Sequence, residues 1–203
     1  PIKIELQNFL KESGDTPGTR KTFIYNTFEK LMKAISKSLK KNDPNHLNLG
    51  IRYGYIEQLD DELLRISKES FDALSFNCYA LSPDHEKMNH ALEISGLPMI
   101  IGEYHFGTVD RGLAQSLWQV NSQKERGDAF RYYTENAFAH RGLIGTGWFR
   151  WIDQNINGRT DGENYNCGFI DVTDRPYPYM VDAAIETAKS LYEIHSGTKT
   201  PFH

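Results

Sequence analysis

The amino-acid sequence predicts an α/β protein built around a parallel sheet, and two observations lead to that prediction. Short apolar segments of strand character alternate along the chain with longer segments in which apolar residues recur at helical spacing. Each of the four strand-like segments is followed by polar or aromatic residues. Because strands that alternate with helices are joined by helical crossovers, they lie parallel in one sheet.

The leading part of the chain contains no predicted strand. Residues 1–25 are mixed in character and include a Ser/Gly/Thr/Pro cluster at 13–19, so we expect an exposed loop segment there. A lysine-rich amphipathic helix is predicted at about 26–41, and Asn42 to Asn45 end it. The chain is expected to form a single domain over residues 1–203, with the βα units in 26–195.

Four strands and four later helices are predicted downstream. The strands fall at 47–53, 71–79, 98–101 and 143–151, and the helices at about 60–67, 83–95, 124–140 and 179–194. The third strand ends on Glu103, and period-two alternation puts Met99, Ile101, Glu103 and His105 on one face. A carboxylate in line with core residues is either a catalytic group or a strand end that turns out to solvent.

The other strand ends favour a site. The first strand ends with Arg52, the second with Asn77 and Tyr79, the third with Glu103 and His105, and the fourth with Trp148 and Trp151. In parallel α/β folds ligands bind outside the carboxyl ends of the strands. We therefore predict one binding or catalytic site at this edge of the sheet.

The composition of the chain excludes two classes of binding partner. The net charge is −4, no basic run occurs, and no apolar run approaches the roughly 18 residues of a membrane span, so neither nucleic acid nor membrane is expected as a partner. The chain starts at Pro1, which indicates a processed or trimmed chain, and its two cysteines form no CxxC motif. The 11 Tyr, 11 Phe and 3 Trp mostly belong to the core, but such a surplus is also typical of carbohydrate clefts.

Two α/β folds fit this order of elements. A doubly wound sheet is possible, yet no Gly-rich phosphate turn follows a strand. A (β/α)8 barrel better explains why Ser75, Asn77 and Tyr79 alternate toward one side, into the barrel mouth. A full barrel needs about 250 residues, so this chain would cover about the last four βα units, a half-barrel.

Four segments then carry a resemblance to a known family. Residues 102–107, 147–154, 158–164 and 168–174 resemble the C-terminal half of a clan-A retaining glycoside hydrolase, closest to the family-50 β-agarases and more distantly to β-galactosidases. The similarity covers roughly residues 47–195 and implies that the four strands are the fifth to eighth of a barrel. It also implies an agarose-type galactan as substrate, no cofactor, and a secreted or periplasmic location.

The resemblance assigns roles to the strand-end residues. It implies that Glu103 is the nucleophile of a double displacement, that Tyr79 donates a hydrogen bond to it, and that Trp148, with Trp151 as the alternative, forms the platform under the sugar. His105 is expected as a hydrogen-bond partner rather than as a catalytic acid. The remaining implied substrate-binding residues are Arg52, Asn77 and His105 at the strand ends and Asp153, Gln154, Arg159, Asp161, Glu163 and Asn164 along the cleft.

The chain departs from the family at one point. In the family the acid/base glutamate follows the fourth barrel strand in an Asn-Glu pair, whereas Glu5 and Glu12 in the leading segment lack that asparagine. The acid/base group is therefore expected outside this chain, and the open edges of a half-barrel predict association with the missing half or with another chain. Three functions stay open: a retaining hydrolase of β-galactosidic bonds, a non-catalytic carbohydrate-binding half-barrel, and one half of a split enzyme.

A calcium loop is the one metal site to weigh. Residues 153–164 nearly match an EF-hand loop, but position twelve is Asn164 instead of glutamate, and a strand precedes the loop where a helix should be. We therefore favour a substrate-facing turn held by its own Asn and Asp side chains.

Overall fold

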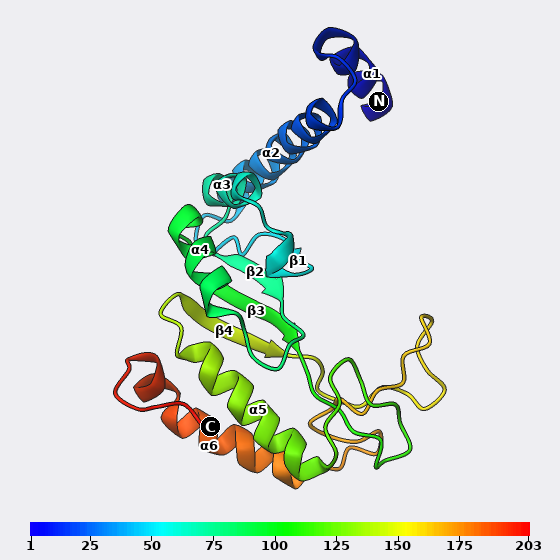
Figure 1. The fold of residues 1–203 in the computed structure, drawn as a ribbon, viewed down its shortest axis with the longest axis vertical. Helices are drawn as coiled ribbons and strands as arrows, with labels where there is room; N and C mark the ends of the chain where they lie inside the picture. Colours follow the sequence, from blue (N-terminus) through cyan, green and yellow to red (C-terminus); the bar gives the residue numbers. More distant parts are fainter.

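The computed structural model describes all residues 1–203 as an α/β protein with one four-stranded parallel sheet, as predicted (Figure 1). The spatial order of the strands, β1-β2-β3-β4, is their order in the chain. The strands are β1 (Arg52–Tyr53), β2 (Leu74–Asn77), β3 (Met99–Tyr104) and β4 (Leu143–Trp148). The helices between and after them are η1 (Ile56–Gln58), α3 (Asp61–Ser70), α4 (His85–Ser95), α5 (Gln123–Phe138) and α6 (Pro178–His195). This succession is consistent with part of a (β/α)8 barrel.

The prediction of a leading loop over residues 1–25 is wrong. Two helices, α1 (Ile2–Ser13) and α2 (Pro17–Asn42), occupy this region and extend away from the sheet; we call them the N-terminal arm (Figure 1). Thr16 caps α2 by accepting a hydrogen bond from the Thr19 backbone N–H, and Pro17 takes the first helical position, where no N–H is needed. The Gly/Thr/Pro cluster is thus a helix start rather than a loop.

The first strand is much shorter than predicted. Only Arg52 and Tyr53 pair with β2, although the expected strand began at residue 47. Gly50 has φ +72°, and the Asn48 side chain accepts from its backbone N–H, so the chain turns here instead of extending. β4 likewise ends at Trp148 and not at Trp151.

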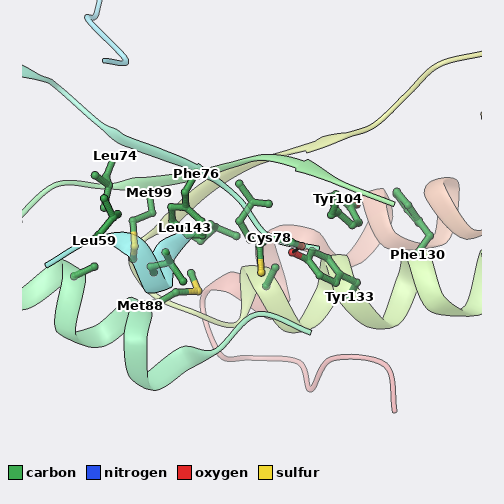
Figure 2. Packing of buried hydrophobic residues seen from close by; sticks show 14 of the residues in the cluster. Leu59, Leu74, Phe76, Cys78, Met88, Met99, Tyr104, Phe130, Tyr133 and Leu143 are labelled. Carbon is green, nitrogen blue, oxygen red and sulfur yellow. Dashed lines mark hydrogen bonds between the residues drawn. The ribbon is translucent and has the colours of Figure 1, made fainter. Parts of the chain in front are cut away.

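The core lies on the helix-covered face of the sheet. Leu74 and Phe76 of β2 are fully buried, whereas Ser75 and Asn77, which alternate with them, are only partly so. Figure 2 shows strand residues such as Phe76 packed above Met88 and Tyr133 of the helices, which are also buried. The opposite face of the sheet carries the polar strand residues.

Glu103 does not share a face with Met99 and Ile101, which corrects the predicted alternation. Phe76 pairs with Ile101, but Asn77 pairs with Glu103, so the register shifts at this point of β3. Tyr104 enters the core with Met99 and Ile101, while Glu103 joins Asn77. The irregularity therefore brings the carboxylate to the polar side of the sheet.

Candidate active site

Glu103 lies at the carboxyl end of β3 and receives three donors from three segments. Arg52 of β1 forms an ion pair with it, Nη2 to Oε1 at 2.7 Å. The Tyr79 hydroxyl donates to Oε2 at 2.7 Å, and the Asn77 side-chain amide donates to the same oxygen at 3.0 Å. The Glu103 side chain keeps 18% of its surface exposed. The structure thus brings four of the predicted residues together around a carboxylate that solvent can still reach.

Gly102 makes room for the arginine. A Cβ at this position would lie 2.2 Å from Cδ of Arg52, because the arginine crosses β2 to reach Glu103. Any side chain at residue 102 would push the guanidinium away. The glycine before Glu103 is therefore part of the site.

Tyr79 is held in its protonated form. Burial, together with the hydrogen bond to Glu103, raises the pKa of Tyr79 well above its usual value. The phenol therefore remains a donor to the carboxylate across the whole working pH range. Arg52, Asn77 and Tyr79 all donate, which is the arrangement that suits an ionised glutamate.

His105 packs against Tyr79 and is fixed by backbone hydrogen bonds. Its Nε2 accepts from the Leu117 backbone N–H at 3.2 Å, so Nδ1 carries the proton and donates to the Phe149 carbonyl at 2.9 Å. The ring packs edge-on against Tyr79 with centroids 4.9 Å apart. Burial lowers the pKa of His105 to about 4, so the neutral ring persists at neutral pH. Both nitrogens are occupied by backbone, which leaves none for a sugar hydroxyl.

The two predicted platform tryptophans differ in their surroundings. Trp148 packs edge-on against Tyr104 and Phe130 of the core, and its indole N–H donates to the Cys167 carbonyl at 2.7 Å. Trp151 is 68% exposed and stacks on Phe169, centroids 5.9 Å apart and planes within 17°. Trp148, the first choice for the platform, is packed among core rings, whereas Trp151, the alternative, offers the larger open ring surface.

Asp153 and Gln154 lie inside the loop after β4, not on a cleft wall. The Asp153 carboxylate accepts from the Gly168 N–H, the Asn166 amide and the Tyr177 hydroxyl, at 2.6–3.1 Å. Gln154 accepts from the Tyr165 N–H and donates to Glu163. Both side chains are buried, so they hold the loop's shape. The exposed members of the predicted set are Arg159 and Asp161, which pair with each other, and the half-buried members are Glu163 and Asn164.

The near-calcium loop is held by its own side chains, as predicted for a turn. The Asn155 side chain accepts from the Asn157 N–H at 2.8 Å, and Asp161 accepts from the Glu163 N–H at 3.2 Å. Arg159 contacts both Asp161 and Glu163. No group of three or more His, Cys, Asp and Glu side chains converges as a metal site would require.

Sequence reasoning missed a buried network around Arg126 of α5. The guanidinium is fully buried and donates to the carbonyls of Phe106 and Gly168 and to the Gln123 side chain, at 2.7–3.1 Å. Through Asn166, Gln123 joins the Asp153 cluster. The network therefore ties the loop after β3 to the loop after β4, which lie side by side beyond the arrowheads in Figure 1. A signal was present: Arg126 stands at helical spacing with three core residues, Phe130, Tyr133 and Ala137.

Comparison with known proteins identifies homologues of this architecture. Over 165 residues the chain is 36% identical to Beta-agarase A of Vibrio sp. (strain JT0107), and over 170 residues 34% identical to Beta-agarase B of the same organism. These alignments cover 78% and 80% of this chain. The solved structure of an exo-beta-agarase superposes with a TM-score of 0.82 at 32% identity, over 90% of this chain and 24% of that one. No protein-family profile matches.

The shared region is a small part of these relatives. The chain spans 16% of the length of Beta-agarase A and 17% of Beta-agarase B. A GH2 beta-galacturonidase from Eisenbergiella tayi, 14% identical with a TM-score of 0.56, shares the fold alone. None of the helices combines the length and the apolar character that a membrane-spanning segment needs.

Two curated β-agarases and a solved exo-beta-agarase structure match most of this chain. The homologues of this chain are therefore β-agarases.

Proposed function

We propose that this chain is the C-terminal half of the catalytic barrel of a retaining glycoside hydrolase that cleaves β-galactosidic bonds in agarose-type polysaccharide. The observation that carries the proposal is Glu103, a partly exposed carboxylate at the end of a parallel strand, surrounded by Arg52, Asn77 and Tyr79. The similarity to two β-agarases supports the substrate class.

In this mechanism Glu103 attacks the anomeric carbon. A carboxylic acid about 5–5.5 Å away protonates the leaving oxygen, and a covalent glycosyl-enzyme forms. The same acid, now a base, deprotonates the water that releases the sugar and restores the carboxylate. Arg52 and Tyr79 hold the two oxygens of Glu103, which fixes its orientation for the attack.

The proton donor would come from the other half of the barrel. Glu5 and Glu12 lie on α1 of the N-terminal arm, away from the sheet (Figure 1). β1 and β4 each have a neighbour on one side only, so a further set of strands could continue the sheet at both edges. A completed barrel would place the acid/base group opposite Glu103.

The test combines the intact mass of the purified protein with hydrolysis of agarose oligosaccharides. Glu103→Gln should reduce turnover at least about 10³-fold while oligosaccharide binding is retained, because the amide keeps the shape but cannot attack. Glu93→Gln is the matched control, since this exposed carboxylate lies on α4 and makes no contact with the Glu103 site. In a preparation whose wild type hydrolyses the substrate, equal turnover of Glu103→Gln and the wild type would exclude Glu103 as the nucleophile.

A second candidate is a carbohydrate-binding half-barrel without catalysis. It is favoured by one observation: the groups that contact the Glu103 carboxylate are donors, and no second carboxyl lies among them. A lone 23.3 kDa species that binds oligosaccharide without cleaving it would support this candidate. Turnover that depends on a second component carrying the missing strands would instead support one half of a split enzyme.

A further inference from the structure

Trp118 lies beside the Glu103 site and has no role in the mechanism above. It belongs to the loop between β3 and α5, and 39% of its surface is exposed. Its indole N–H donates to the backbone carbonyl of Tyr79 at 2.7 Å. The hydroxyl of Tyr79 in turn donates to Glu103. Tyr79 therefore contacts both the indole of Trp118 and the candidate nucleophile.

The backbone around Trp118 is fixed from several directions. The Gly107 N–H donates to the Trp118 carbonyl at 2.9 Å, and the Val120 N–H donates back to the Gly107 carbonyl at 2.9 Å. The Ser116 hydroxyl also donates to the Trp118 carbonyl, and the Leu117 N–H donates to His105. A Cβ on Gly107 would lie 2.5–2.6 Å from neighbouring atoms, so the loop packs directly on the strand end. Trp118 is therefore exposed yet preorganised, which lowers the entropy cost of binding through it.

The bound N–H restricts what this indole can offer a ligand. Its one donor is taken by Tyr79, so the remaining surface is the aromatic ring. A neutral sugar ring presents a face of C–H groups that matches such a surface, and an exposed rigid tryptophan is the residue type most enriched among binding hot spots. Trp148 differs because core rings pack against it, and Trp151 differs because it stacks on Phe169.

Resting on the proposed function, we infer that Trp118 is a second aromatic platform, which binds one sugar ring of a neutral agarose-type oligosaccharide next to the ring held at Glu103. The loop after β3 would then help to distinguish long oligosaccharides from short ones. A ligand that fills only the Glu103 position does not reach this platform, whereas a longer oligosaccharide does.

The experiment measures the affinity of D-galactose, which fills one position only, and of a neoagaro-hexasaccharide for the wild-type chain and three variants by calorimetry. Trp118→Ala should weaken hexasaccharide binding about tenfold and change galactose binding far less. Trp118→Phe keeps a ring but loses the N–H, and it should retain affinity within about threefold. Leu117→Ala is the control, because this exposed side chain is a neighbour whose backbone contact to His105 is unaffected.

The outcomes separate the inference from the proposed function. Wild-type binding that Trp118→Ala leaves unchanged overturns the platform but not the function. Equal losses in Trp118→Phe and Trp118→Ala, for both ligands, would mean that the residue only anchors Tyr79, and this also overturns the platform. No oligosaccharide binding by the wild type overturns the proposed function and the inference with it. Near-ultraviolet circular dichroism of each variant establishes that the fold is retained.

Discussion

The N-terminal arm differs in its internal contacts from the site end, by which we mean the carboxyl ends of β3 and β4 with the loops that follow them. Around the ends of β3 and β4, buried polar groups such as Arg126 and Asp153 have several partners each, and the loops are fastened to the sheet. α1 has no buried residue, and α2 buries only Met32 and Ser36 of its 26 residues. Large apolar side chains of the arm, including Ile24, Leu31, Ile35 and Leu39, remain exposed.

The contrast shows which part of the chain carries its own structural support. The site end is held in place by contacts within the chain, so its geometry is determined locally. The arm contributes an apolar helix face without a counterpart among residues 1–203. Mutations should therefore have large effects at the site end and small effects along the exposed face of the arm.

The largest effect is expected at Arg126. Arg126→Met leaves the carbonyls of Phe106 and Gly168 and the side chain of Gln123 without their donor in a buried region, and it removes the positive charge near Asp153. We expect the free energy of unfolding to fall by about 3–5 kcal/mol, measured by urea titration. Arg141→Met on the surface is the control and should change it by less than about 0.5 kcal/mol. A loss below 1 kcal/mol at Arg126 would show that the network is not what fastens the two loops.

Acid should weaken the site end through His105. Its pKa is about 4 in the fold and 6.5 unfolded, so between these values the unfolded chain binds a proton that the folded chain does not. The stabilisation is complete above pH 6.5 and is lost as the pH falls toward 4, by up to about 3 kcal/mol. His140, whose pKa burial also lowers, adds to the same trend, so the test compares His105→Asn with the wild type. The slope of unfolding free energy against pH should be shallower in the variant; parallel slopes would contradict the assignment.

The arm gives a smaller and more selective effect. Met32 is buried against Ile66 and Phe71, so Met32→Ala should cost about 2 kcal/mol. Leu31, its neighbour on the same helix, is 54% exposed, and Leu31→Ala should change stability by less than about 0.5 kcal/mol. Thermal unfolding of the two variants side by side is the measurement. Equal losses would mean that the exposed face of α2 is covered in solution.

The smallest expected effect is at Gly102, where a substitution should change function more than stability. Gly102→Ala places a Cβ against Arg52 and should displace its guanidinium from Glu103, which weakens turnover or oligosaccharide affinity about tenfold. Gly145→Ala is matched to it, because a Cβ there meets only Ile100 at an ordinary 3.7 Å. Gly145→Ala should behave as the wild type in the same assay. Identical behaviour of the two variants would show that the Arg52 contact has no role.

Much of this arrangement could be predicted from the sequence because it depends on local patterns. Helical spacing predicted α3 to α6 within a few residues of their ends, and the alternation of strands and helices predicted the parallel sheet. The resemblance to glycoside hydrolases implied that Tyr79 donates to Glu103, and the structure has that hydrogen bond. These features depend on neighbours along the chain or on motifs several residues long.

The rest depended on contacts between distant segments. The shift that moves Glu103 off the Met99 face arises in the pairing of β3 with β2, which periodicity within one strand cannot show. Asp153 looked like a cleft residue because it is acidic and lies in a polar loop, but Gly168 and Tyr177 fold back on it. α1 was missed because it directly precedes a turn-forming cluster that proved to be the start of the next helix.

The positions of the three tryptophans make the two regions optically distinct. Trp118, Trp148 and Trp151 all lie at the site end, and the arm has none. Tryptophan fluorescence therefore reports only on the site end, whereas the far-ultraviolet dichroism of the helices includes the arm. Unfolding curves that coincide by both probes would reveal a single cooperative unit, and an earlier dichroism transition would reveal an arm that melts on its own.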